Sequence, residues 1–488
     1  MRHRNNQPSD DLEDLEDVPD RELVIPSEGE PEPPPAVTRR VDLTQGHLLT
    51  QIARLSWPIV AASFVHWLMG VVDIKMVGTL GPAAIAAVGT SREAIFTFLT
   101  LIFAVATGAQ VMTARYMGQH DAGKAADVCR QAIILGIIMT AILGPAGYFL
   151  SGSLLSLLGA QGETLAEGTV YMQTFFLGTL PLLLGFMLTS SLQGAGDTLT
   201  PLYVNIATVA ANIVLNWLLI FGIGPFPAMG VVGAAWGTVI ARTFAGAAFV
   251  WIITSGKFAL HVPLRARWLI DLAVWGKMFY IGVPSSIEGF ARNMGFLSLF
   301  WILNQTDAGR MAVAGYTISV QIRMFGVMFG LALMSAAMTA VSQNMGAKDI
   351  ARAEKSGWTI TGISTGVMAL MGVGSIVLAN PLISFFTDSP EATHWGVISL
   401  IVLSLSLPFT GLSMGCAGSL RGAGDTLSPL YATLLFTTGV GPALAYLLTV
   451  TMNLGPVGAW VGLAVSGALQ ALMVAAIFKR GKWKQIEL

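Results

Sequence analysis

A 13-residue segment occurs twice in this chain, and the duplication limits the folds that the sequence can adopt. Residues 191–203 read SLQGAGDTLTPLY and residues 419–431 read SLRGAGDTLSPLY, so 11 of 13 positions are identical at an offset of 228. The same offset relates Met117-Gly118 to Met345-Gly346 and Asp121 to Asp349. The sequence therefore predicts two copies of one unit, packed as two related bundles.

Composition indicates the solvent in which these bundles fold. Hydrophobic residues make up 54% of the chain and charged residues 11%, with a mean hydropathy of +0.67. Soluble domains contain about 25% charged residues, so this composition indicates an integral membrane protein. Eleven of the 28 acidic residues lie within the first 36 positions, so an acid within the later apolar segments needs a specific reason.

Residues 1–44 differ in composition from the rest. They are rich in Asp, Glu, Pro and Ser, include the run PEPPP at positions 31–35, and contain too little apolar surface to fold. They lack the charged-then-apolar layout of a signal peptide. The sequence predicts a disordered acidic N-terminal tail, which is either a plain solvated tail or a docking or regulatory arm.

Twelve apolar segments beyond the tail are long enough to cross about 30 Å of hydrocarbon as helices. The expected spans are residues 54–77, 88–115, 128–151, 168–190, 200–222, 231–254, 273–303, 312–343, 356–379, 394–417, 428–450 and 456–479. The predicted fold class is therefore all-α. It has a six-helix lobe at residues 45–254, a linker at 255–272, a second six-helix lobe at 273–480 and a C-terminal tail at 481–488.

Basic residues predict the orientation of these helices. They gather beside the first span, between spans 2 and 3, around the linker, between spans 8 and 9 and at the C-terminus, whereas the opposite loops contain almost none. The positive-inside rule then predicts a multi-pass protein of the cell (inner or plasma) membrane with both termini in the cytoplasm. Because six is an even number, both lobes have the same orientation and their pseudo-two-fold axis runs along the membrane normal. The linker is expected to touch lipid headgroups and no nucleic acid.

The duplicated segment predicts a turn followed by a capped helix. Its glycines permit a tight backbone, and its aspartates can cap the next helix. The residues concerned are Gly194, Gly196 and Asp197 in the first copy and Gly422, Gly424 and Asp425 in the second. By letters alone they match the GxGD signature of intramembrane aspartyl proteases, but both copies fall in turns and no second catalytic Asp lies at membrane depth. Metalloprotease, nucleotide-binding and serine-nucleophile motifs are also missing from the sequence, so no enzyme activity and no cofactor are expected.

Polar residues within apolar spans are costly unless they are paired or used. Asp73 in the first span is surrounded by apolar residues, and Lys75 points to another face. Such a carboxylate can take up and release a proton, or it can pair with a basic residue of a neighbouring helix. Asn212 and Asn216 lie one turn apart in the fifth span, within reach of Asp73, and Thr238 lies in the sixth. These oxygens suit a proton or a small cation, or they only join helices.

Several features together resemble the multidrug and toxic compound extrusion (MATE) family over residues 45–480: the two lobes, Asp73, the paired GAGDT turns, and the segments NIVLN and GVVGAAWGT. The resemblance implies a functional monomer whose lobes rock between outward and inward access. It implies export of organic cations or other amphipathic compounds in exchange for H⁺ or Na⁺. It maps the cation-coupling site, with Na⁺ as the metal ion it would take, onto Asp73, Asn212, Asn216 and Thr238. Some proton-coupled members have Asp where Asn216 stands, so a strict two-Asp relay is in doubt here.

The second lobe departs from the sodium-coupled branch of that family. That branch has one acid deep in the seventh helix and another in the tenth. Here Glu288 comes only four residues after Pro284, and no acid lies between Glu391 and Asp425. A sodium site in this lobe is therefore not expected. Glu288 and Arg292 are spaced for an ion pair on one helix face, and they either form that pair or face the substrate.

Further residues are candidates for a cavity between the lobes or for helix bends. Aromatic and methionine side chains suit flat hydrophobic cations through soft contacts and cation–π attraction. The candidates are Trp67, Met69 and Met294, with Gln321 as a polar one. Pro58 and Pro284 hold corresponding places in the first and seventh spans, where lost backbone hydrogen bonds predict bends.

Three classes of function remain on these grounds. The main prediction is an antiporter that exports organic cations or amphipathic drugs. The alternative is a lipid-linked saccharide flippase of related architecture, which would need a strongly basic cavity for pyrophosphate. A channel, a receptor or a membrane enzyme forms the third class.

Overall fold

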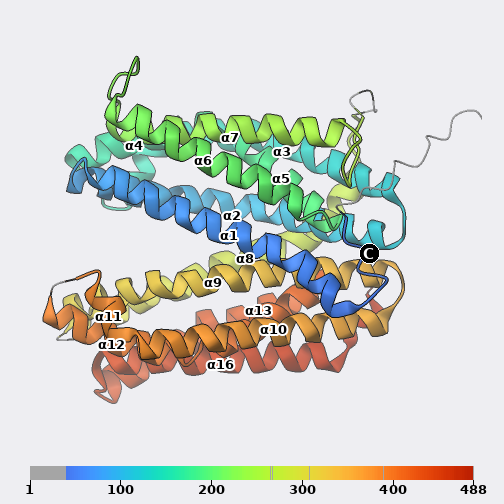
Figure 1. Ribbon diagram of the computed structural model, residues 1–488. Coiled ribbons are helices and arrows are strands. Elements are labelled where there is room, and N and C mark those ends of the chain that lie inside the picture. The colour runs from blue at the N-terminus through green and yellow to red at the C-terminus, as the bar shows by residue number, and fades with distance from the viewer. Residues whose placement is uncertain (1–39, 264, 266–267, 307, 388, 487–488) are drawn as a thin grey trace, which may run out of the picture. The chain divides into compact units, whose positions relative to one another are not determined.

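The computed structural model describes residues 40–486 apart from 264, 266–267, 307 and 388, and these residues are predominantly helical (Figure 1). The first half contains α1 (Leu48–Gly78), α2 (Pro82–Gly118), α3 (Ala122–Leu157), α4 (Gly162–Leu177), α5 (Thr179–Gly194), α6 (Leu199–Phe221) and α7 (Gly230–Thr254). The second half begins with α8 (Leu272–Leu303), α9 (Gly309–Gly346), α10 (Ile350–Val377), α11 (Ala379–Ser384), α12 (Pro390–Ser404) and α13 (Leu407–Ala423). It ends with α14 (Leu427–Ala432), η1 (Thr433–Val440), α15 (Gly441–Tyr446), η2 (Leu447–Thr451), α16 (Gly455–Arg480) and η3 (Lys482–Gln485).

These helices account for the twelve expected spans. Among the described residues, eight helical segments are long and apolar enough to cross a membrane, and three bent segments also qualify. The bent segments are α2, α4 with α5, and α12 with α13. The twelfth is α8, whose Lys277, Glu288 and Arg292 make it less apolar than the others. The predicted all-α, twelve-helix fold class is confirmed.

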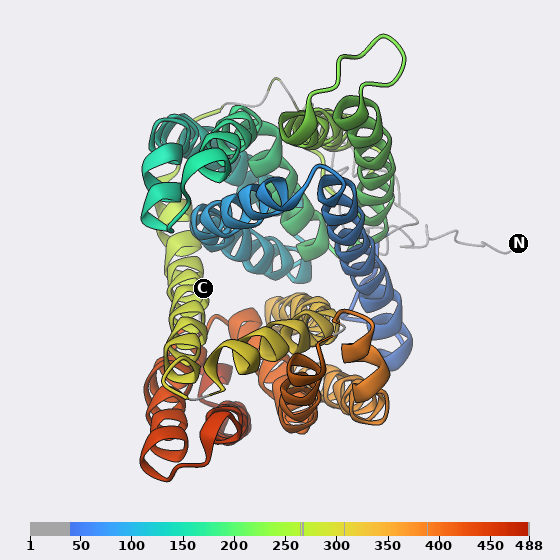
Figure 2. The same cartoon turned by 90° about the vertical axis from the view of Figure 1, so that its left-hand side faces the viewer.

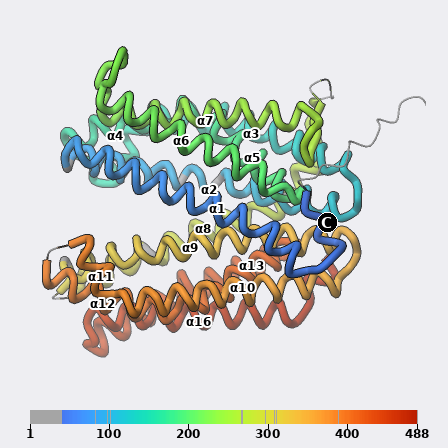
Figure 3. The backbone as a smooth tube through the Cα atoms, in the orientation of Figure 1, coloured from blue at the N-terminus to red at the C-terminus, as the bar shows by residue number. Residues whose placement is uncertain are grey.

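The two halves of the chain form two bundles, with α1 to α7 in one and most of α8 to α16 in the other (Figures 1 and 2). The tube in Figure 3 shows that the long helices of both bundles run along a common direction. The helices that pack on both bundles include α1, which packs on α6 and α9, and α8, which packs on α2, η1 and α15. The two bundles are here called the N-lobe and the C-lobe. Since α1 and α8 hold corresponding places in the repeat, each lobe packs one equivalent helix on the other lobe.

A pair of equivalent glycines lies where α2 and α9 of the two lobes approach each other closely. A Cβ on Gly118 would collide with the backbone carbonyl of Gln343, and a Cβ on Gly346 would collide with that of Arg115. Gly118 and Gly346 are 228 positions apart, as are Arg115 and Gln343. The contact of α2 with α9 is thus symmetric, and only residues without a side chain allow it.

One end of the structure, here called the basic end, holds the turns at residues 119–121, 195–198, 347–349 and 424–426 together with segments 40–47 and 481–486 (Figure 1). Two of these turns are equivalent. Asp121 accepts a hydrogen bond from the backbone N–H of Lys124, and Asp349 accepts one from Arg352, both at 2.9 Å. An Asp that binds the free N–H groups of a first helical turn starts a helix, so the repeat starts α3 and α10 in the same way.

Residues 40–47 are part of the fold. Leu43 is fully buried, and its carbonyl accepts a 2.7 Å hydrogen bond from Arg352 of the C-lobe. The backbone N–H of Val41 donates to Gly196 of the N-lobe at 3.1 Å. The expected disordered tail of residues 1–44 is therefore wrong for residues 40–44, because the apolar Leu43 fits between the two lobes. Residues 1–39 lie outside the described residues.

Candidate functional site

Asp73 is buried within the N-lobe and is bonded from two neighbouring helices. Its Oδ2 lies 2.9 Å from Nη2 of Arg92 in α2, and its Oδ1 accepts a 2.8 Å hydrogen bond from Nδ2 of Asn216 in α6. The side chain of Asp73 is 5% exposed and that of Arg92 is 34% exposed. Lys75 is exposed and points away, as its spacing predicted. Asp73 therefore pairs with a basic residue of a neighbouring helix, which was one of the two expected alternatives.

The other predicted residues of this site lie beside Asn216. Nδ2 of Asn212 is 3.2 Å from Oγ1 of Thr238, and Oδ1 of Asn212 accepts from Asn216 at 3.3 Å. Turning the Asn212 amide over lets its nitrogen donate to Oδ1 of Asp73 at 3.2 Å and its oxygen accept from Thr238. The structure thus brings together Asp73, Asn212, Asn216 and Thr238 as the sequence predicted, through side chains that lie one helical turn apart on α6.

A second guanidinium belongs to this group. Arg242 of α7 interacts electrostatically with Asp73 and with Arg92, and it lies over the ring of Phe175 at 5.6 Å from the centroid. A guanidinium on an aromatic face is stabilised by the ring quadrupole. Arg92 and Arg242, with Asp73, Asn212, Asn216 and Thr238, are here called the Asp73 cluster. It contains two positive charges and one negative charge.

A second charged group lies in the C-lobe. Oε2 of Glu288 is 2.6 Å from Nη2 of Arg421 in α13, and Oε1 is 3.0 Å from Nη2 of Arg292. Glu288 and Arg421 are buried, with side chains 5% and 6% exposed, whereas Arg292 is 45% exposed. The expected pair on one face of α8 is present, and Arg421 adds a partner from another helix. These three residues are here called the Glu288 cluster.

The remaining predicted cavity residues do not gather at one place. Trp67 packs on Phe325 of α9, with ring centroids 5.1 Å apart, and so joins the two lobes. Met69 is half-buried, while Met294 and Gln321 are exposed on α8 and α9.

The sharp bends lie away from the two predicted prolines. Both α1 and α8 continue through Pro58 and Pro284 as single helices. Bends above 40° occur instead within α2 (45°), between α4 and α5 (56°) and between α12 and α13 (46°). Pro58 is buried beside Leu55 and Ile59, which pack on small residues of α9.

Both copies of the GAGDT segment form the predicted capped turn. Gly196 and Gly424 have φ values of +86° and +101°, which favour glycine. Asp197 accepts from the backbone N–H of Thr200, and Asp425 accepts from that of Ser428, both at 3.0 Å. A Cβ on Gly194 would collide with the carbonyl of Gln110, and a Cβ on Gly422 would collide with the carbonyl of Met338. These two glycine contacts are also equivalent in the repeat.

Several polar residues that the sequence analysis did not select join the lobes near the basic end. Nε2 of Gln110 donates to the hydroxyls of Ser335 (2.8 Å) and Thr339 (3.0 Å) in α9. Oγ of Ser335 donates to Oε1 of Gln193 at 3.0 Å, and Nε2 of Gln343 donates to the carbonyl of Gly194 at 3.0 Å. Gln110, Gln193, Ser335, Thr339 and Gln343 are here called the lobe seam. Each of these bonds crosses from the N-lobe to the C-lobe.

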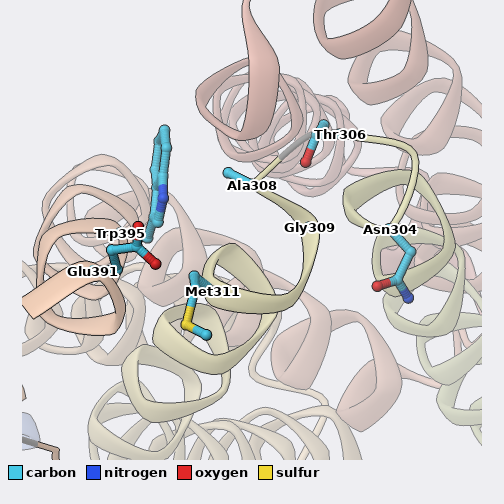
Figure 4. Close-up of a pocket in the computed structure, with 7 residues that line it drawn as sticks. All are labelled: Asn304, Thr306, Ala308, Gly309, Met311, Glu391 and Trp395. Carbon is cyan, nitrogen blue, oxygen red and sulfur yellow. The ribbon is translucent and has the colours of Figure 1, made fainter. Parts of the chain in front are cut away.

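A pocket of about 430 Å³ lies elsewhere, at the far end of the C-lobe (Figure 4). Its walls come from the turn before α9 and from the start of α12, including Asn304, Met311, Glu391 and Trp395. None of the predicted site residues lines this pocket. It therefore does not help to locate the coupling site.

Two signals in the sequence point to the residues that were missed. Position 193/421 is one of only two that differ between the copies of the 13-residue segment, and the change from Gln193 to Arg421 is the larger of the two. Arg92 is a basic residue within the second apolar span, where an unpaired charge is costly. No comparable signal marks the other residues of the lobe seam, Gln110, Ser335, Thr339 and Gln343.

Comparisons with known proteins identify the family of this chain. The MatE family model matches residues 58–218 and 284–447, which are equivalent parts of the two lobes. The chain is 26% identical over 446 residues to the probable multidrug resistance protein NorM of Thermotoga maritima, covering 89% of this chain and 93% of that one. It is 27% identical over 430 residues to the multidrug resistance protein NorM of Burkholderia vietnamiensis, covering 87% and 92%.

Solved structures show the same fold. A MATE family multidrug resistance transporter in an outward-facing conformation superposes with a TM-score of 0.84 at 22% identity, covering 91% of this chain and 98% of that one. A MOP superfamily transporter from Pyrococcus furiosus gives a TM-score of 0.83 with the same identity and coverage. The family model alone spans more than half of the chain in two matched halves, and the chain therefore belongs to the MatE family of multi-pass membrane transporters.

Proposed function

We propose that this chain is a secondary active antiporter that exports organic cations and other amphipathic small molecules in exchange for H⁺ or Na⁺. The observation that carries the proposal is the Asp73 cluster, in which a buried carboxylate is held by side chains of α2 and α6. A charge at membrane depth is retained where it serves transport or is paired. The similarity to multidrug resistance proteins supports small-molecule export as the transported function.

The contacts between the lobes support alternating access. The lobe seam joins the lobes near the basic end, and Trp67 meets Phe325 further along. Asp73 lies six residues beyond Trp67 on α1, about 9 Å further from the basic end. If the basic end faces the cytoplasm, as the positive-inside rule predicts, this arrangement is closed toward the cytoplasm and the Asp73 cluster lies on the outer side of the closure.

In this mechanism the coupling cation and the substrate favour different access states. Entry of the cation from outside neutralises Asp73, which weakens its bonds to Arg92 and Asn216. Because those bonds join α1 to α2 and α6, their loss changes the packing of α1, which also packs on α9 of the C-lobe. Coupling requires only that cation and substrate stabilise the two states unequally. We propose that the monomer in the cell membrane is sufficient for the cycle.

Dye efflux from drug-hypersensitive bacteria tests the proposal. Cells expressing the wild-type chain or Asp73→Asn are loaded with a cationic fluorescent dye, and the pH and sodium gradients are collapsed separately. Efflux that requires Asp73 and stops when one gradient is collapsed supports the antiporter and identifies its ion. Undiminished efflux by Asp73→Asn excludes the coupling role, and dye retention by a well-expressed wild type excludes cationic dyes as substrates. The flippase alternative has no specific observation in its favour.

A further inference from the structure

The groups that face the Asp73 carboxylate are all N–H donors. Oδ2 is met by the Arg92 guanidinium and Oδ1 by the Asn216 amide, at 2.9 and 2.8 Å. In its second amide orientation Asn212 adds another N–H to Oδ1 at 3.2 Å. A metal cation, by contrast, needs oxygen ligands, and a hard cation such as Na⁺ has little affinity for N–H groups. The carboxylate is therefore satisfied from within the protein.

The surrounding charges also oppose a second cation. Arg92 and Arg242 both act electrostatically on Asp73, so the cluster already contains more positive than negative charge. Other charged or titratable side chains on these helices include His66 and Lys75 on α1, Glu93 on α2, and Glu167 and Tyr171 on α4. On α9, Arg323 interacts with Tyr316 rather than with Asp73. A metal ion bound at the Asp73 carboxylate would therefore be repelled by two guanidinium groups.

We propose that Arg92 is a tethered cation that fills the position beside Asp73 and excludes alkali-metal cations from this site. The inference rests on the proposed function, because it assigns the ion selectivity of the same site. A guanidinium fixed to the neighbouring helix has a high effective concentration at the carboxylate and competes with free ions without being consumed. A proton binds on a carboxylate oxygen itself and needs no coordination sphere, so Arg92 does not exclude it in the same way.

The cluster retains the oxygens that a metal ion would need if Arg92 were neutral. Oδ1 of Asn216 is buried and has no hydrogen-bond partner among the described residues. The Asp73 carboxylate would be released from its ion pair. Oγ1 of Thr238 in α7 is also near, because it lies 3.2 Å from the side-chain amide of Asn212. Replacing Arg92 by a neutral side chain of similar length should therefore create a sodium site from groups that are already present.

Equilibrium binding of ²²Na⁺ to the purified full-length chain in lipid nanodiscs tests this directly. We expect wild-type protein to show no sodium binding that depends on Asp73. Arg92→Gln should gain saturable binding that depends on Asp73, and the double variant Arg92→Gln/Asp73→Asn should lose it. Arg92→Lys keeps the charge and should remain without binding. Arg323→Gln, which removes a guanidinium that does not act on Asp73, is the matched control and should behave as wild type.

Two outcomes overturn the inference. If wild-type protein binds sodium and Asp73→Asn abolishes this binding, Arg92 does not exclude the ion. This comparison does not require any Arg92 variant to fold. A folded Arg92→Gln protein without added sodium binding shows that Arg92 is not what excludes it. Because binding is measured without transport, either result is distinct from failure of the proposed function, which would appear as dye retention by wild-type cells.

Discussion

The two copies of the 13-residue segment form the same turn but use one side chain differently. At the position where they differ most, Gln193 accepts a hydrogen bond from Ser335 across the lobe seam, whereas Arg421 forms a buried ion pair with Glu288 of α8. The glycines and aspartates that form the turn are the same in both copies. The two copies thus have the same backbone turn. The side chain at position 193 or 421 decides whether the copy bonds to the other lobe or to a helix of its own lobe.

The two contacts differ in the energy needed to separate them. The bond of Gln193 joins neutral groups between lobes, and such a bond contributes about 1 kcal/mol. The pair of Glu288 and Arg421 is buried in the C-lobe, where loss of one partner leaves an uncompensated charge. The first copy therefore provides a contact that can break during a cycle, and the second copy provides an anchor for α8 on the C-lobe.

The largest effect is expected when the second copy is made like the first. Arg421→Gln removes the buried partner of Glu288 and leaves Arg292, which is 45% exposed and holds only Oε1. We expect a loss of about 3 kcal/mol in stability, because breaking a buried pair strands the other charge. A large fall in the apparent melting temperature of the purified protein in detergent would show it.

A paired substitution controls that experiment. Glu288→Gln/Arg421→Gln removes both charges, and it should recover much of the lost melting temperature because no buried charge is left alone. If Arg421→Gln melts with the wild type, the buried pair does not anchor α8. If the double variant is no better than the single one, the effect comes from packing of the arginine rather than from its charge.

A smaller effect is expected at the first copy, and it should change a population rather than stability. Gln193→Ala removes the acceptor for Ser335, so the closed basic end loses about 1 kcal/mol and the lobes separate there about five times more often. Spin labels on Ala122→Cys and Ala351→Cys, at exposed positions in the first turns of α3 and α10, report the distance between the lobes by pulsed electron resonance. The buried native residues Cys129 and Cys416 should stay unlabelled.

The matched control for this prediction is Thr437→Ala, a change that removes a hydroxyl bonded to Gln470 within the C-lobe. It should leave the distance distribution unchanged. A Gln193→Ala protein with the wild-type distribution would mean that the remaining bonds of the lobe seam, from Gln110 and Gln343, hold the closure without it.

Features that depend on local chemistry could be predicted from the sequence, whereas features that depend on neighbouring helices could not. Helix positions followed from apolar length, and the turns followed from glycine and aspartate, because both depend on local chemistry. The breaks near Gly178 and Ser406 were missed, and bends were expected at Pro58 and Pro284 instead. A proline kink depends on whether neighbouring helices hold the course of the chain, and one sequence does not contain that information.

Within the site, the polar residues of one helix face were predicted and the arginine partners were not. The spacing of Asn212 and Asn216 predicted only that both lie on one helix face, and the family resemblance added that this face meets Asp73, 143 positions from Asn216. Arg92 and Arg421 reach their carboxylates from other helices, 19 and 133 positions away. Because an unpaired charge within the membrane is costly, a carboxylate there is expected to have a partner, but the sequence does not show which helix provides it.

The smallest effect is expected at a repeated cap outside the spans, where the copies serve the same purpose. Asp121 caps α3, and the backbone N–H of Lys124 holds the pKa of Asp121 below its ordinary value. A carboxyl whose pKa is lowered by folding stabilises the fold above the unfolded value near 4, and this stabilisation is lost as pH falls through the folded value. Asp121→Asn retains a capping oxygen that does not titrate. We expect its melting temperature to fall slightly less than that of wild type between pH 5 and pH 3, and equal curves would show that the cap contributes through geometry alone.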